Sequence, residues 1–174
     1  MVELLVAISL FTVIAFFSLG ALLSIYDANK KSQTSKTVVD NLNLAVENMT
    51  RTIRFGSSYH CTNTGDLSAP RDCNGNPPTD NFIAVTFNGT LIAYRLNGTA
   101  IQRSDNPNGG ESTYKNITSD DTTIEYLRFY VLGSMNPLNQ PYVVAVIKGY
   151  VGSKPTTRTT FSIQTLMSQR TLDI

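Results

Sequence analysis

The longest apolar run of the chain lies at its N-terminus. From Leu4 to Tyr26 no residue is charged. The run is longer than the roughly 20 residues that a helix needs to cross the apolar core of a bilayer. A secretory signal peptide would carry basic residues ahead of a shorter apolar core, and no Lys or Arg precedes this run. The pattern therefore predicts that residues 1–26 form the transmembrane half of a helix.

Helical periodicity continues beyond the apolar run. Apolar residues fall on one stripe of a helix with 3.6 residues per turn, at Val38, Leu42, Ala45, Val46, Met49 and Ile53. No proline occurs before Pro70, and Gly56 supplies a stop signal after Phe55. One helix of roughly 80 Å can thus run from near the N-terminus to about Phe55. Residues 27–55 are its amphipathic half, and we expect their apolar stripe to pack on the structure that follows.

The sequence pattern of the second part of the chain predicts β-structure. The pairs Asn88-Gly89 and Asn97-Gly98 separate three short runs rich in β-branched and aromatic residues, and Asn-Gly is the strongest short-range hairpin signal. We predict a meander from about Phe82 to Arg103. A sheet that is apolar on one face needs a cover, which the helical stripe provides. The fold class is therefore α+β, with an antiparallel β-sheet head over residues 82–174. Further strands are predicted over residues 124–132, 142–151 and 159–168.

Charge adds little to this picture. The formal net charge is +1 and 16% of the residues are charged, so charge alone gives no basis for nucleic-acid binding. Lysines follow the apolar run, and they indicate either a cytoplasmic flank or the solvated start of the amphipathic half. They are Lys30, Lys31 and Lys36.

The two cysteines lie in a segment rich in Asn, Gly, Pro and Asp, which we predict to be a connecting loop over residues 56–81. Two cysteines outside the membrane most simply form one disulfide, so Cys61 and Cys73 are expected to staple the connection between helix and sheet. The alternative is a metal site that combines His60 with both thiols, although this offers few ligands.

Motifs for catalysis are sparse. His60 is the only histidine, so a catalytic triad would have to use it. The chain has no phosphate-binding glycine loop, no HExxH and no paired CxxC. Oxygen ligands for calcium occur between Asp105 and Asp121, but their spacing differs from that of an EF-hand. We expect no enzymatic activity, no cofactor and no bound metal.

The first residues, MVELLVAISLF, resemble the N-terminal motif of bacterial type IV pilins and type II secretion pseudopilins. Mature chains of that family usually begin Phe-Thr and carry a glutamate at the fifth position. Met1 and Val2 match the third and fourth positions of the motif, and Glu3 matches the glutamate. The resemblance is specific over these residues and architectural over the rest. It implies that a leader, cut off by a prepilin peptidase, and two further mature residues precede Met1.

The resemblance also implies a role for Glu3. In the family this glutamate pairs with the N-terminal amine of a neighbouring subunit as the subunit joins the filament. A carboxylate within hydrocarbon is costly unless it is paired, which agrees with such a role. The alternative is stabilisation of the positive end of the helix dipole, worth about 0.3 to 1 kcal/mol. The residues that we assign to assembly are Glu3, Leu4, Leu5, Leu10, Phe11 and Gly20.

Gly20 has several explanations that stay open, one of which is chance, since glycine is common in membrane helices. It falls where many filament pilins carry a helix-breaking proline, so the helix can loosen there on assembly. A glycine also lets helices pack closely in a membrane. Either use would offset the roughly 1 kcal/mol that glycine costs in a helix interior relative to alanine.

These implications predict a structural subunit of an extracellular type IV pilus-like filament, either a minor or a major pilin, with a length and a β-rich head that look closer to minor pilins or the larger pseudopilins. The chain would first be inserted in the cytoplasmic (inner) membrane and then polymerise at the cell surface through its apolar helix. Its partners would be copies of itself and other pilin-like subunits, besides the prepilin peptidase. The alternatives are a pseudopilin of a type II secretion system and a membrane-anchored surface adhesin, in which the helix is only an anchor.

Overall fold

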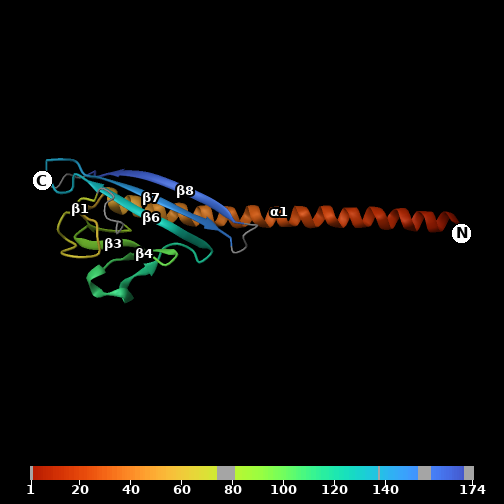
Figure 1. Cartoon of the computed structure of the whole chain (residues 1–174), viewed down its shortest axis with the longest axis horizontal. Coiled ribbons are helices and arrows are strands. Elements are labelled where there is room, and N and C mark those ends of the chain that lie inside the picture. The colour runs from red at the N-terminus through yellow and green to blue at the C-terminus, as the bar shows by residue number, and fades with distance from the viewer. Residues whose placement is uncertain (1, 74–80, 137, 153–157, 171–174) are drawn as a thin grey trace. The chain divides into compact units, whose positions relative to one another are not determined.

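The structure is a computed structural model that describes residues 2–73, 81–136, 138–152 and 158–170. The side chains at positions 34, 35, 37 and 38 also lie outside this description. By its internal contacts the chain divides into two compact units, Met1–Thr37 and Val38–Ile174. We call the second unit the head. Figure 1 labels the helix and most of the strands.

The N-terminal element is one helix, α1, which covers Val2–Arg54 and so confirms the predicted helix to about Phe55. The side chain of Tyr59 folds back over its C-terminal end. There the Tyr59 hydroxyl lies 2.7 Å from the carbonyl oxygen of Ile53 and 3.0 Å from that of Gly56. A Cβ atom at Gly56 would collide with the side chain of Val85, so the backbone of the helix end lies close against the sheet.

The first sheet, sheet 1, has five antiparallel strands in the order β1-β2-β3-β4-β5. The predicted meander is confirmed, because Phe87 pairs with Thr90 and Asn97 pairs with Ala100 across two tight turns. Both residues of the first turn have positive φ, 49° at Asn88 and 75° at Gly89, as the Asn-Gly signal requires. The strands are β1 Ser57–His60, β2 Phe82–Phe87, β3 Thr90–Asn97, β4 Ala100–Ser104 and β5 Lys115–Asn116.

Short strands at both edges of sheet 1 fall where the sequence predicted none. β1 lies in the segment expected as a connecting loop, and β5 follows two 3₁₀ turns, Pro107–Gly109 and Glu111–Thr113. Neither strand is long enough to show an alternating pattern of its own. Each exists because a neighbouring strand pairs with it, β2 in one case and β4 in the other.

The second sheet, sheet 2, has three antiparallel strands in the order β6-β7-β8. They are β6 Thr122–Leu132, β7 Tyr142–Val151 and β8 Thr159–Ser168, which confirms the three further strands predicted from the sequence. Side chains alternate between buried and accessible along β6 and β7. A bulge between Ile124 and Tyr126 shifts the register and leaves Glu125 as the extra residue.

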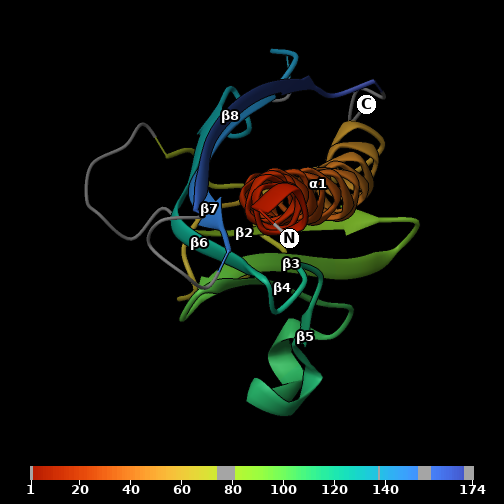
Figure 2. The same ribbon diagram turned by 90° about the vertical axis from the view of Figure 1, so that its right-hand side faces the viewer.

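The core of the head lies between the two sheets and the second half of α1. Figure 2 shows sheet 2 arching along one side of this helical segment while sheet 1 lies on another side. The stripe is buried as predicted at Leu42, Ala45, Met49 and Ile53, and Val46 is half-buried. Val38, the remaining member of the predicted stripe, lies outside the described side chains. The packing of an amphipathic helix on antiparallel sheets is therefore confirmed.

One buried hydrogen bond ties α1 to the middle of sheet 1. The hydroxyl of Tyr94 donates to the hydroxyl of Thr52 over 3.0 Å, and Thr52 in turn donates to the carbonyl of Asn48 over 2.9 Å. Burial raises the pKa of Tyr94, so its hydroxyl stays protonated and remains a donor. A polar pair within the core thus has both hydroxyl protons satisfied.

Candidate functional site

The N-terminal part of α1 is the one helical segment of the described chain that is long and apolar enough to cross a membrane. This segment covers Val2–Gln33. The four apolar residues that the sequence assigned to assembly are exposed, by 65% at Leu4, 69% at Leu5, 59% at Leu10 and 73% at Phe11. Large apolar side chains exposed together in this way are typical of a segment that contacts lipid or another protein surface.

Three hydroxyl groups within this apolar segment are satisfied by the helix itself. Ser9 donates to the carbonyl of Val6 over 2.8 Å, and Thr12 donates to that of Ile8 over 2.7 Å. Ser18 bonds in the same way to the carbonyl of Ile14. None of these hydroxyls needs water, so they do not oppose an apolar environment.

Glu3 stands in the first turn of α1 and is exposed. Among the described residues no basic group lies within ion-pair distance of its carboxylate, since the two ion pairs found there are Arg95–Glu111 and Arg103–Asp105. The structure thus places Glu3 beside the exposed leucines at the start of the apolar segment. It leaves open both interpretations of this carboxylate, the helix dipole and a neighbouring subunit.

Gly20 lies within uninterrupted α-helix. A Cβ atom built there would meet no atom within 4 Å. Among the described residues, no packing therefore demands glycine at position 20.

The disulfide between Cys61 and Cys73 is present as predicted, with a Cα–Cα distance of 6.0 Å. Cys73 also pairs with Val131 of β6 through two backbone hydrogen bonds of 2.9 Å each. Next to it, the carboxylate of Asp72 accepts hydrogen bonds from the backbone N–H groups of Gly133 (3.0 Å) and Ser134 (2.7 Å). The connection after the helix is therefore fastened to sheet 2 as well as to sheet 1.

The side chain of His60 is buried within this connection and does not face an open site. Its ring is buried, with Nδ1 2.7 Å from the carbonyl of Ala69 and Nε2 3.1 Å from that of Thr64. Both cysteines of the alternative metal site are in the disulfide. Across the described ranges, no group of three His, Cys, Asp or Glu side chains is placed to hold a metal ion.

Two of the acidic residues considered for calcium are engaged with arginines. Glu111 pairs with Arg95, whose guanidinium also lies 3.6 Å from the ring centroid of Tyr114, and Asp105 pairs with Arg103 over 2.8 Å. The hydrogen bonds from Arg95 hold the pKa of the Glu111 carboxyl below its ordinary value. Glu111 thus links the second 3₁₀ turn to β3, whereas the pair of Asp105 with Arg103 is a local contact at the end of β4.

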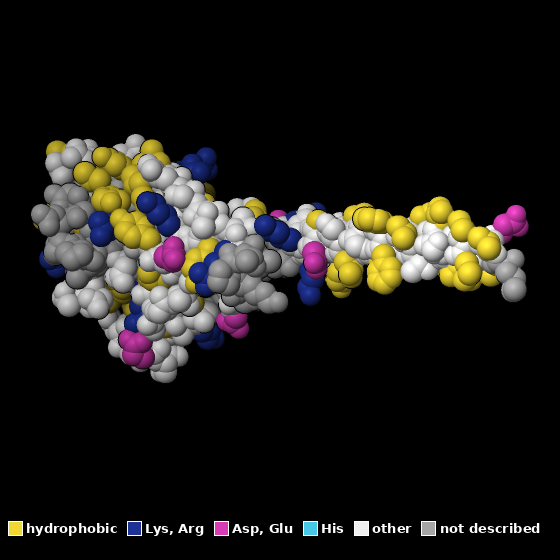
Figure 3. Space-filling model, turned by 45° about the vertical axis from the view of Figure 1, so that its right-hand side comes forward, with side chains coloured by type: hydrophobic (Ala, Val, Ile, Leu, Met, Phe, Trp, Pro, Cys, Tyr) yellow, Lys and Arg dark blue, Asp and Glu magenta, His cyan; other side chains and the backbone are white. Residues whose placement is uncertain are grey.

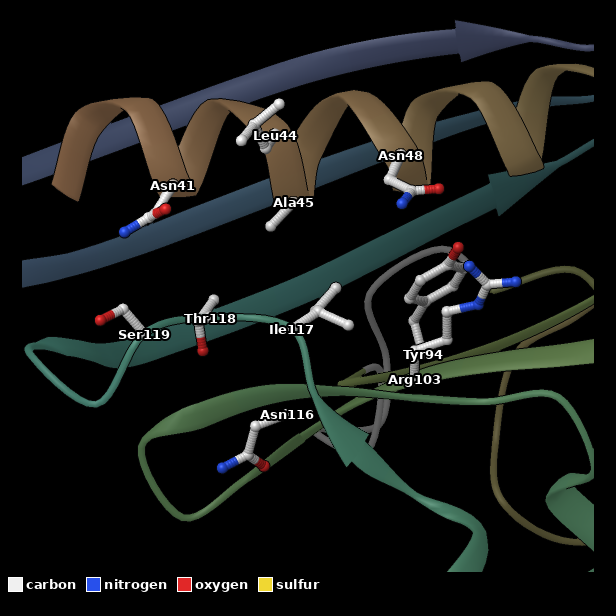
Figure 4. Close-up of a pocket in the computed structure, with 10 residues that line it drawn as sticks. All are labelled: Asn41, Leu44, Ala45, Asn48, Tyr94, Arg103, Asn116, Ile117, Thr118 and Ser119. Atoms are coloured by element: carbon white, nitrogen blue, oxygen red, sulfur yellow. The ribbon is translucent and has the colours of Figure 1, made fainter. Parts of the chain in front are cut away.

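A groove of about 410 Å³ runs along one side of α1 in the head, and no pattern in the sequence predicted it. In Figure 4 the side chains of Asn41, Ala45 and Asn48 point from the helix toward the segment that joins β5 to β6, where Thr118 and Ser119 lie. Tyr94 and Arg103 stand at one end. The lining is made of polar, aliphatic and aromatic side chains and of Arg103.

The outer face of sheet 2 is the second feature that sequence reasoning missed. Strand register places its side chains in rows. Two rows are cationic, Tyr126–Lys148–Ser162 and Arg128–Val146–Gln164, and the next two are apolar or aromatic, Tyr130–Val144–Leu166 and Leu132–Tyr142–Ser168. The alternation within each strand was visible in the sequence, but which residues stand side by side depends on the pairing of strands.

Comparisons of the chain with models of protein families, with curated proteins and with solved structures found no match. The architecture by itself, a long apolar N-terminal helix followed by an antiparallel β-sheet head, is compatible with a pilin-like protein.

Proposed function

We propose that the chain is a structural subunit of a type IV pilus-like filament, of the minor-pilin kind, which polymerises through its N-terminal helix. One observation carries the proposal. A single helix, α1, is apolar and exposed along its first half and supplies core residues of the head with its second half. A membrane anchor needs only the apolar half, whereas a subunit that moves from membrane to fibre benefits from a helix continuous with its folded head.

The energetics of assembly indicate that Glu3 contributes to the preference for the fibre. Lipid tails are as apolar as leucine, so moving Leu4, Leu10 or Phe11 from lipid into a fibre gains packing and little hydrophobic free energy. An unpaired carboxylate at the edge of the hydrocarbon is costly, and pairing with an amine removes that cost. Pairing of Glu3 with a neighbour's N-terminal amine therefore favours the fibre over the dispersed subunits.

The same proposal predicts where the chain is located, first in the cytoplasmic membrane and then at the cell surface. The subunit resides first in the cytoplasmic membrane through residues 2–33, with the head on the outer side, and is then drawn into a surface filament after processing by a prepilin peptidase. A disulfide such as Cys61–Cys73 persists in oxidising compartments outside the cytosol, which supports an external head. A pseudopilin of a type II secretion system would share every one of these features.

A membrane-anchored surface domain is the second candidate, and one observation favours it. The groove of about 410 Å³ lies within the size range of small-molecule sites, so the head has room for a ligand of its own. In that case the apolar helix serves only as an anchor, and no surface fibre containing the chain would exist.

The deciding experiment compares two amidations of carboxylates in α1. Glu3→Gln removes the charge at the start of the apolar segment, and Asp27→Asn makes the same chemical change at an exposed position beyond Tyr26. The full chain is expressed with its assembly machinery, and the sheared surface fraction is analysed by immunoblot and by immunogold electron microscopy.

We expect wild type and Asp27→Asn in labelled filaments, and Glu3→Gln retained in the membrane with about tenfold less chain in the sheared fraction, a loss that corresponds to about 1.4 kcal/mol. Absence of labelled filaments for the wild type would favour the anchored domain. Equal incorporation of both variants would remove the assigned role of Glu3.

A further inference from the structure

The two edges of sheet 2 differ in how far they are protected. An edge strand leaves a row of backbone N–H and C=O groups without a partner in the sheet, and proteins usually protect it with charges, proline, a bulge or a covering segment. β6 forms one edge and carries a bulge at Glu125. Val131 of β6 exchanges two backbone hydrogen bonds with Cys73. At the other end of β6, the N–H of Ile124 donates to the carbonyl of Thr99. This edge is therefore protected by several devices at once.

β8 forms the other edge and has none of these devices. Thr159–Ser168 contains no charged residue and no proline. The register of β8 with β7 continues along the whole strand without a shift. Between residues 160 and 168, the described chain shows no backbone hydrogen bond to any segment other than β7. Figure 2 shows β8 as the last strand of the arch around α1. Half of its backbone groups are thus free to bind a further strand.

The edges of sheet 1 offer little to a further strand. β1 has four residues, with a positive φ of 53° at Ser58, and β5 has two residues. Strands this short provide few backbone groups in a row. Among the described strands, β8 is therefore the one edge that is long, regular and uncharged.

The core of the head also stops short at β8. Ile147 of β7 is fully buried, whereas Ile163 beside it in β8 is half-buried, as is Phe161. Both side chains of β8 pack against the core cluster. On the outer face Leu166 is 66% exposed, and Figure 3 shows hydrophobic side chains gathered on the surface of the head. A further strand beside β8 would cover apolar side chains on both faces.

We propose that the free edge of β8 accepts an extended segment of a different protein chain as a further strand. The edge offers backbone groups in a row, and an extended backbone is the ligand that satisfies them in a row. The accepted segment carries apolar residues at every second position, because those side chains would lie beside Phe161 and Ile163. A charge at such a position would be buried without a partner.

A second copy of this chain is the other possible partner. Among its described strands the only long free edge is again β8, and two identical edges pair about a two-fold axis and close into a dimer. A closed contact cannot continue from one subunit to the next along a filament. The choice of a different chain therefore rests on the proposed function.

The test uses a peptide with the sequence of Tyr142–Val151, made soluble by short polyethylene glycol chains. This is β7, the segment that already pairs with β8 in antiparallel register. The control peptide has proline in place of Val144, Ala145 and Val146, so it lacks backbone donors. Binding to the full chain in detergent is measured by fluorescence anisotropy, and amide exchange is measured residue by residue. The control peptide should bind at least about tenfold more weakly than the intact one.

The intact peptide should also slow exchange at alternate amides of β8 by more than about tenfold, while β1 and β6 stay unchanged. These are the amides that point away from β7. Equal binding of both peptides would overturn the proposal. Protection at another edge, or in the groove beside α1, would also overturn it.

Two neighbouring substitutions supply matched variants. Thr165→Lys places a charge on the inner face, where an added strand would bury it, and Gln164→Lys places the same charge on the exposed outer face. Thr165→Lys should weaken peptide binding by more than about tenfold, and Gln164→Lys by less than about threefold. Thermal unfolding checks that both heads are folded. Equal effects in two folded variants would overturn the proposal, and if Thr165→Lys does not fold, the exchange map of the wild type decides.

Two further outcomes separate the partners and the proposals. If β8 is protected without peptide, and the protection grows with protein concentration, a second copy occupies the edge and the proposal is wrong. A chain that binds the peptide but appears in no filament would leave the strand-accepting edge standing and overturn the proposed function. Labelled filaments of a chain that does not bind the peptide would do the reverse.

Discussion

Truncation of Ile53 tests the division of α1 into a folding half and an assembly half. Ile53 is fully buried, and it lies in one core cluster with Met49 and Tyr59. Ile53→Ala removes buried methylene and methyl groups and leaves a cavity, which costs about 2 to 5 kcal/mol depending on how far the site collapses. The Tyr59 hydroxyl and the backbone of Gly56 fix this end of the helix against the sheet.

Because the helix end is fixed in this way, we expect little collapse around the cavity and a loss near 3 kcal/mol or more. For a domain of this size such a loss lowers the melting temperature by roughly 10 °C. The assay is thermal unfolding of the full chain in detergent, followed by near-ultraviolet circular dichroism of the head tyrosines. Leu44→Ala is the matched control, since Leu44 is 64% exposed in the same helical segment, and it should change stability by less than about 0.5 kcal/mol.

Phe11→Ala supplies the opposite case. Phe11 is 73% exposed in the apolar segment, so its truncation should leave the melting temperature nearly unchanged while lowering incorporation into filaments. If Ile53→Ala and Phe11→Ala destabilised the head equally, the division of the helix would be wrong. A head that tolerated Ile53→Ala as well as Leu44→Ala would refute the argument from burial.

Three further predictions concern the connection after the helix and the loop before β5. Replacing both Cys61 and Cys73 by serine should lower the free energy of unfolding by about 3 kcal/mol, and non-reducing peptide mapping of the wild type should show the link directly. Asp72→Ala leaves two backbone N–H groups without their acceptor and should cost about 1 to 3 kcal/mol, measured by urea unfolding, while the exposed Asp121→Ala should be nearly neutral. The pKa of Glu111 is lowered in the folded chain, so the stabilisation from its pairing with Arg95 is present above the ordinary value of 4.5 and disappears as the pH falls through the lowered pKa. Carboxyl titration by nuclear magnetic resonance should show a midpoint below 4.5 for Glu111, and Arg95→Met should bring it back toward that value.

The elements that sequence reasoning predicted are those with strong local signals. The helix shows in an uninterrupted apolar run and then in a stripe, and each Asn-Gly turn fixes the hairpin around it because both of its residues accept positive φ. The disulfide was predicted because the sequence has two cysteines, Cys61 and Cys73, and both lie outside the apolar run. Such signals depend on residues near one another along the chain.

The division into two sheets depends on contacts between distant residues. Cys73, in the connection between β1 and β2, pairs with Val131 of β6, and the N–H of Ile124 donates to the carbonyl of Thr99 over 2.9 Å. Periodicity in the sequence does not indicate which strands pair with one another. The groove beside α1 and the rows of side chains on sheet 2 could therefore not be predicted. Glu3 and Gly20 make no contact in the described chain that assigns either of them a role, so neither could be tested from the fold.

The head segment of α1 presents three faces with different surroundings. Substitutions on these faces should therefore affect folding and assembly separately. Met49 faces the core, Asn48 faces the groove, and Glu47 faces solvent, although the three are consecutive in sequence. A cavity at Met49 weakens folding, whereas reversing the charge of Glu47 leaves the core intact and changes only what the outer surface attracts. A screen of this one segment, read for melting temperature and for incorporation into filaments together, should therefore separate folding defects at Met49 from any assembly defect at Glu47. If every assembly defect in the segment followed the melting temperature, the solvent-facing side of the segment would have no role of its own.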